Sequence, residues 1–244
     1  MNGIEWLIGV ATASIAFLYA SVGHAGASGY IALLALAESA KEELRSSSLL
    51  LNVLVSMITS IQFLRAGHWS SRIFVPCASA SVPMAVVGGM MTLPSTIFHM
   101  LIGIVLVYSA ATFIIRPQEA EEVVDPPLLL LFFLGGVIGL LSGMIGVGGG
   151  IFLTPLLISL RWSKMKTAAG ISSVFILVNS ISGLVGLACG GGIHPSSHLP
   201  AMAASALIGG GIGARMGSGR FSVITLKRIL ATVLVIAGGK IILE

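Results

Sequence analysis

Residues 141–155 read LSGMIGVGGGIFLTP, and they decide the fold because a glycine-rich run, residues 146–150, interrupts an otherwise apolar stretch. Residues 22–29, VGHAGASG, contain a similar interruption. Backbone amides inside a bilayer must be hydrogen-bonded, so a run of this kind is tolerated there only where it is buried in protein or lines a polar cavity. If the chain spans a membrane, both stretches therefore predict a break between two helical segments.

The composition places the chain in a membrane. Of its 244 residues, 56% are hydrophobic and 9% are charged, which leaves too little polar surface for a soluble domain. Apolar stretches of about 17 to 25 residues, enough to cross a roughly 30 Å hydrocarbon core, recur from end to end. We therefore expect an all-α polytopic membrane protein embedded in the lipid bilayer.

Polar clusters divide the chain into two transmembrane repeats, residues 1–115 and 128–244, joined by the acidic, proline-containing linker 116–127. Glu5 and the lack of a cationic start argue against a cleaved signal peptide. The expected apolar segments are 4–22, 26–37, 48–64, 74–93 and 97–115 in the first repeat, and 127–145, 148–160, 168–188, 200–216 and 223–243 in the second.

The two sets of segments have the same order of features, which indicates an internal duplication. Each has a glycine-broken helix pair, a basic loop (41–45 and 161–166), a serine-rich helix with an asparagine, a short turn, a glycine-rich helix and a closing helix. Duplicated halves are typical of transporters with a site between the repeats, and they also occur in channels. The distribution of Lys and Arg slightly favours inverted over parallel repeats.

The second glycine run predicts an anion site. A helix that restarts near Gly149 or Gly150 has unpaired amides and the positive end of the helix dipole at its start. With Gly148, these glycines are candidate substrate-binding residues. Glycines spaced by four can instead mark close helix packing, and we favour that interpretation for the stripe of Gly135, Gly139 and Gly143.

The charged residues favour an anionic substrate. All nine carboxylates lie near segment ends or in loops, whereas cation carriers and proton pumps usually keep an acidic residue within the membrane. The net charge of +4 follows the distribution expected for cytoplasmic loops and gives no reason to expect a nucleic-acid partner.

Three candidates lie at the first break. His24 could donate to an anion or carry a coupled proton, since imidazole titrates near neutral pH; the alternative is a neutral histidine bonded to a neighbouring carbonyl. Gly26 and Ser28 follow it in the sequence and are further candidates for substrate binding.

The serine-rich helices supply Asn52, Ser173 and Asn179 as candidates. Aligning the two repeats places Asn179 opposite Val55, one helical turn from Asn52, so that both amides could face one cavity. The alternatives are an amide that only joins two helices and a serine that bonds back to its own helix.

Four stretches carry a family resemblance: residues 139–157, 168–186, 209–218 and 63–72, the last with an AGH turn. On these stretches the chain resembles the TauE/SafE family of sulfite and organosulfonate exporters over essentially its whole length. The resemblance is clearest in the second repeat, whose AAGISSVFILVNSISGLVG is similar to the family's G-T-S…N-S-x-x-G pattern. In the first repeat VGHAGASG replaces the usual glycine run, and the usual Asn-Ser is displaced to Asn52.

The resemblance implies a non-enzymatic secondary transporter of small sulfur-containing anions, with sulfite or an organosulfonate as substrate, in the bacterial cytoplasmic (inner) membrane. A homodimer is an open alternative to a monomer, and no cofactor or metal is expected. Two other functions stay open. One is an anion channel of the same architecture; the other is a rhomboid-like serine protease, because GASG fits G-x-S-G with Ser28 as nucleophile, although such a short motif is weak.

Overall fold

The computed structural model describes residues 3–36, 41–91, 100, 122–222, 224, 225 and 228, and these residues form helices, turns and loops without a β-strand. The predicted segments 97–115 and 223–243, and most of the linker 116–127, lie outside the described residues. The elements are α1 (Gly3–Ser21), α2 (Ala27–Leu36), α3 (Lys41–Arg65), α4 (Ser71–Met90), α6 (Leu128–Ile145), α7 (Gly150–Ser159), α8 (Met165–Gly190), α9 (Leu199–Arg215) and the π-helical turn η1 (Met216–Arg220).

Four helices, α3, α4, α6 and α8, are long and apolar enough to cross a membrane. Their outward faces are apolar as well: on α6, Leu129 is 80% exposed and Phe133 is 67% exposed. Side chains of this size are exposed where lipid rather than water surrounds the protein. The fold is therefore that of a multi-pass helical membrane protein.

The structure corrects one predicted loop. Residues 41–45, expected as a basic loop, form the first turn of α3. The sequence KEELR consists of good helix formers, and Glu42 and Glu43 lie at the positive end of the helix dipole, where carboxylates are stabilising. Arg45 is consequently a helix residue, and it is only 8% exposed.

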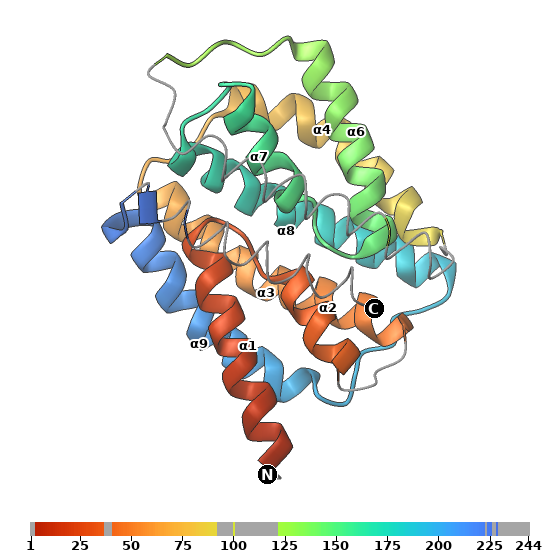
Figure 1. Cartoon of the computed structure of the whole chain (residues 1–244). Helices are drawn as coiled ribbons and strands as arrows, with labels where there is room; N and C mark the ends of the chain where they lie inside the picture. Colours follow the sequence, from red (N-terminus) through yellow and green to blue (C-terminus); the bar gives the residue numbers. More distant parts are fainter. Residues whose placement is uncertain are drawn as a thin grey trace.

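Several helix pairs approach closely through glycines, as expected for the stripe on α6. A Cβ on Gly135, Gly139 or Gly143 would overlap the backbone of α4, and one on Gly209, Gly213 or Gly217 would overlap the backbone at α1. The small residues let the helix backbones touch, which favours helix association in lipid. Figure 1 shows the pairs α4–α6 and α1–α9, with α3 and α8 packed between them.

The contacts also give the directions of the helices. In the α4–α6 pair Gly135 faces Cys77 and Gly143 faces Ala85, so the two helices are parallel. In the α3–α8 pair the order is reversed, because Gly183 lies against Leu49 whereas Gly170 lies against His68, beyond the end of α3. Helices α3 and α8 are therefore antiparallel.

One end of the bundle carries most of the described basic residues. There His68 Nε2 lies 3.1 Å from the carbonyl oxygen of Ser218, and Lys166 Nζ donates to the carbonyl of Gly219 at 3.3 Å. At the opposite end, the amide of Ser196 donates to Ser47 Oγ at 2.8 Å. The basic end is formed by the ends of α3, α7 and α9 and the starts of α4 and α8, and its described cations are Arg65, Arg72, Arg161, Lys164, Lys166, Arg215 and Arg220.

Candidate functional site

Both glycine-rich stretches separate two helices. Helix α6 ends at Ile145, where Gly146 adopts a left-handed conformation with φ 86° and its amide bonds to the carbonyl of Ser142 at 2.8 Å. Helix α7 begins at Gly150, so four residues separate the two helices. In the first half α1 ends at Ser21 and α2 begins at Ala27. The chain between each pair of helices depends on glycines with positive φ, a conformation that side chains with a Cβ rarely adopt.

The two glycine-rich segments meet at His24. His24 Nε2 lies 3.0 Å from the carbonyl oxygen of Gly150 and 2.8 Å from Thr154 Oγ1. Because a carbonyl can only accept, we assign the hydrogen to Nε2. Thr154 Oγ1 in turn donates to Ser172 Oγ at 2.7 Å. Nδ1 of His24 is buried without a hydrogen-bond partner, so one ring nitrogen is available to a ligand.

Asn52 supplies a second unpaired polar group next to the same segment. Its side chain is 0% exposed, and neither Oδ1 nor Nδ2 has a hydrogen-bond partner. Ser180 Oγ on α8 is also buried and unpaired. Buried polar groups are almost always hydrogen-bonded, so an unpaired amide beside an unpaired hydroxyl indicates a place for a polar ligand or water.

Gly148 lies beside both Asn52 and Ser180. It has φ 78°, and a Cβ built on it would lie 3.0 Å from Asn52 Nδ2, 2.9 Å from Ser180 Oγ and 2.8 Å from Ile176 Cγ2. Any side chain at this position would therefore occupy the space that the two polar groups face. The absence of a Cβ keeps the backbone at the start of α7 open to them.

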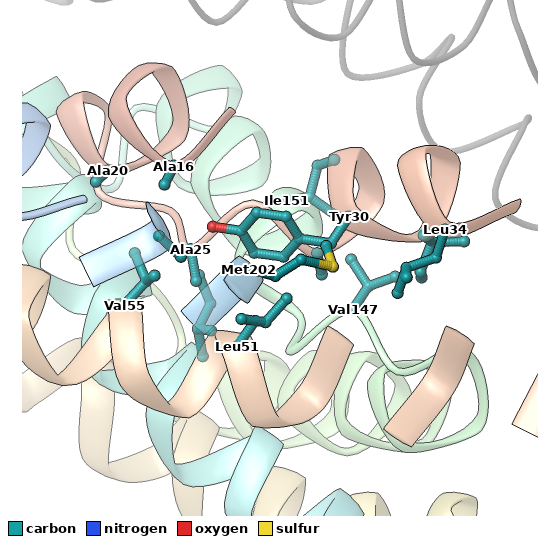
Figure 2. Packing of buried hydrophobic residues seen from close by; sticks show 14 of the residues in the cluster. Ala16, Ala20, Ala25, Tyr30, Leu34, Leu51, Val55, Val147, Ile151 and Met202 are labelled. Atoms are coloured by element: carbon teal, nitrogen blue, oxygen red, sulfur yellow. The ribbon is translucent and has the colours of Figure 1, made fainter. Parts of the chain in front are cut away.

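Two of the predicted residues in the first half, Gly26 and Ser28, lie in sequence between Ala25 and Tyr30, which belong to a cluster of buried hydrophobic residues (Figure 2). Ser28 Oγ lies 2.6 Å from the hydroxyl of Tyr19, so its partner among the described residues is a tyrosine and not the histidine base that a serine protease needs. Tyr30, labelled in Figure 2, is fully buried and its hydroxyl is unpaired. A Cβ on Gly26 would lie 2.9 Å from that hydroxyl.

The remaining predicted residues are placed differently. Asn179 Oδ1 accepts from Ser81 Oγ, and Nδ2 donates to the carbonyl of Phe175, both at 2.8 Å; its amide joins α8 to α4 instead of facing the space beside Asn52. Ser173 Oγ bonds back to the carbonyl of Gly170 at 2.8 Å. A Cβ on Gly149 would meet the ring of Phe175 at 2.8 Å, so this glycine allows close packing.

The sequence did not single out Arg45, yet it has the largest set of polar contacts near the second break. Its guanidinium donates to the carbonyls of Gly143 on α6, Gly88 and Gly89 on α4, and Met91 just after α4. Its stem lies against Gly146. Within the described ranges no carboxylate forms an ion pair with Arg45. The negative ends of two helices offset its charge.

Two surface hollows lie away from this cluster. One, of about 260 Å³, is lined by residues that include Arg72, Asp125 and Lys164. The other, of about 640 Å³, is lined by residues that include Gln62 and Arg215. Neither hollow is lined by any of the predicted substrate-binding residues, so the buried cluster and not these hollows is the candidate site.

Comparisons with known proteins agree with the sequence resemblance. The family model described as "Sulfite exporter TauE/SafE" matches residues 7–241. The chain is 36% identical over 233 residues to "Probable membrane transporter protein y4hK" of Sinorhizobium fredii (strain NBRC 101917 / NGR234), which covers 93% of this chain and 94% of that protein. No solved structure matches the chain. With a helical membrane fold and a match over nearly its whole length, the chain belongs to the TauE/SafE sulfite exporter family of membrane transporters.

Proposed function

We propose that the protein is a secondary transporter that exports small sulfur-containing anions, such as sulfite or organosulfonates, across the bacterial inner membrane by alternating access. The observation that carries the proposal is the meeting of the two glycine-rich segments at His24 and Gly150, beside buried polar atoms without partners. Transporters built from repeats commonly bind substrate where interrupted helices meet.

The helix directions support two inverted repeats, with α1 to α4 equivalent to α6 to α9. Equivalent helices of inverted repeats run in opposite directions across the membrane, and α3 and α8, the third helices of the two repeats, are antiparallel. Contacts between repeats also occur in matched pairs: Gly23 packs against Ala169 near the start of α8, and Gly146 packs against Arg45 near the start of α3. Parallel repeats would require α3 and α8 to run the same way.

The charges support an anion as the substrate. The unpaired donors at the candidate site are the amide of Asn52 and the hydroxyl of Ser180, and among the described residues no carboxylate is buried. The start of α7 adds the positive end of a helix dipole. The specific choice of sulfur anions rests on the names of the family model and on the sequence motifs.

Transport into proteoliposomes tests the proposal. Purified protein should give saturable uptake of labelled sulfite or methanesulfonate, and unlabelled substrate on the opposite side should accelerate it by counterflow. Gly148→Leu should abolish this flux while the variant still inserts into the membrane, because a leucine would occupy the space that Asn52 and Ser180 face. Wild-type flux in Gly148→Leu would contradict the site assignment.

The same experiment separates the alternatives. An anion channel would give flux that does not saturate and shows no counterflow. A serine protease would react with a serine-directed probe at Ser28, and the contact of Ser28 with Tyr19 argues against it. Whether the transporter is a monomer or a homodimer is a separate prediction, which its mass in detergent would decide.

A further inference from the structure

The unpaired groups at the candidate site are electrically neutral. Asn52 offers an amide, and Ser180 offers a hydroxyl, both next to Gly148. His24 already donates through Nε2 to the carbonyl of Gly150, so its other ring nitrogen is uncharged in the neutral tautomer. The polar surface that faces Gly148 therefore contains hydrogen-bond donors and acceptors without a full charge.

The nearest buried cation, Arg45, already has hydrogen-bond partners outside the site. The guanidinium of Arg45 bonds to carbonyls on α4 and α6, and only its aliphatic stem reaches Gly146. Lys41 begins α3 at the opposite end of the bundle, and the other described lysines and arginines lie at the basic end or beyond it along the chain. Among the described residues, positive potential at the site comes from the start of α7, whose dipole is equivalent to about half an elementary charge.

We propose that this site takes oxyanions with a single negative charge and discriminates against doubly charged oxyanions of the same shape. The inference rests on the proposed function, because it concerns the site where the two glycine-rich segments meet. It assigns the substrate class as monoanions, such as a sulfonate or hydrogen sulfite, and it assigns Ser180 to the site together with Asn52.

The physical reason is the cost of removing charge from water. The desolvation free energy of an ion in a medium of low dielectric constant grows with the square of its charge. Neutral donors and a helix dipole can offset one negative charge, as they do for anions at helix starts. A second charge has no cation to compensate it among the described residues. A dianion therefore has the larger desolvation cost without additional electrostatic stabilisation.

A pair of ligands of similar shape tests the inference. Methanesulfonate keeps one negative charge over the accessible pH range, whereas methylphosphonate changes from one to two charges at its second ionisation. Dissociation constants are measured from thermal stabilisation of the purified full-length protein, at a pH below and a pH above that ionisation. We expect methylphosphonate to bind about tenfold more weakly as the dianion, with methanesulfonate as the control for titration of the protein itself, including His24.

The outcomes distinguish a failure of the monoanion inference from a failure of the proposed function. Equal or tighter binding of the methylphosphonate dianion, relative to methanesulfonate at the same pH, would overturn the monoanion inference and leave the transport proposal standing. Stabilisation by neither ligand nor by sulfite would overturn the proposed function and this inference with it.

A matched pair of serines on α8 tests the position. Ser180→Ala removes an unpaired hydroxyl beside Gly148 and should weaken methanesulfonate binding about tenfold. Ser182→Ala removes a hydroxyl that bonds back to the carbonyl of Val178 at 2.8 Å and should leave binding unchanged. Equal effects of the two variants would contradict the assignment of Ser180.

Discussion

Among single residues, Asn52 and Asn179 have the same side chain and the same complete burial but opposite surroundings. Asn179 is bonded to Ser81 and to the carbonyl of Phe175, whereas both polar atoms of Asn52 are unpaired. A buried amide with its partners stabilises the fold, and one without them is a desolvation cost. Asn179 therefore has a structural role, whereas the polar atoms of Asn52 would gain hydrogen bonds from a ligand.

Replacing each asparagine with leucine distinguishes these roles. Asn52→Leu should leave the melting temperature in detergent unchanged or raise it, because no hydrogen bond is lost and an unpaired amide is removed. It should also abolish the stabilisation that substrate gives. Asn179→Leu should lower stability by about 1–3 kcal/mol because it leaves its partners unpaired. If Asn52→Leu were as destabilising as Asn179→Leu, Asn52 would be structural.

The candidate residues could be predicted from the sequence only in part. The break at 146–150 identified Gly148 as a candidate, and the ionisable side chain in the first apolar region identified His24. The pairing of each side chain depends on which helix it faces, and the sequence does not contain that information for Asn179 or Ser173. Arg45 was missed because a cation near a segment end ordinarily lies in solvent, and the KEELR stretch does not indicate that two helix ends converge on it.

Between helices, the close contacts at glycines are specific to one face. On α9 an added Cβ on Gly213 would overlap the carbonyl of Phe17, whereas one on Gly211 would meet nothing within 4 Å. These glycines are two residues apart and therefore point to different sides of the helix. The glycine face of α9 is what allows α1 to approach it.

Alanine at these two positions should have opposite effects. Gly213→Ala should lower stability by about 1–3 kcal/mol, since it forces α1 and α9 apart. Gly211→Ala should be neutral or stabilising by up to about 1 kcal/mol, because alanine favours the helix over glycine. Thermal unfolding of both variants in one detergent measures the difference, and equal melting temperatures would show that the α1–α9 contact is not as close as described.

The contacts of Arg45 give a second prediction at this scale. Its planar guanidinium reaches carbonyls on two helices, and a lysine ammonium cannot reproduce that geometry. Arg45→Lys should therefore lower stability by about 1.5–3 kcal/mol. Arg65→Lys, at the exposed other end of α3, is the matched control and should change it little. A full rescue of stability by lysine at position 45 would mean that only the charge matters.

For the whole molecule, the basic end gives the orientation in the membrane. Its described lysines and arginines are expected on the cytoplasmic side, and the loop after α8, with its Ser196 amide bonded to α3, is expected outside. Arg45 lies near the opposite end of the bundle but is buried between helices, so it is not an outer loop cation.

Cysteine labelling at the two ends of α9 tests this orientation. In a background without Cys77 and Cys189, Ser197→Cys should react with an impermeant maleimide in intact cells. Gly219→Cys should react only after the membrane is permeabilised. Both positions are exposed, so access to reagent and not burial decides the result. The reverse pattern would contradict the proposed topology.

The sequence predicted the helical membrane class and the positions of the described apolar helices to within a few residues, apart from the start of α3. Composition and apolar stretch length determine those features because the bilayer sets both. The sequence favoured inverted repeats only slightly, since a count of cations depends on which residues lie in loops. Helix direction is a property of tertiary contacts such as Gly170 against His68.

The most direct test of the central claim is counterflow of labelled sulfite in proteoliposomes that contain Gly148→Ala or Gly136→Ala. A Cβ at position 148 would enter the space between Asn52 and Ser180, whereas one at position 136 would meet only Ala80 and Met84 at 3.6 Å and 3.8 Å. We expect Gly148→Ala to abolish counterflow and Gly136→Ala to retain it. Counterflow at the wild-type rate in Gly148→Ala would contradict the claim that the substrate binds where the two glycine-rich segments meet.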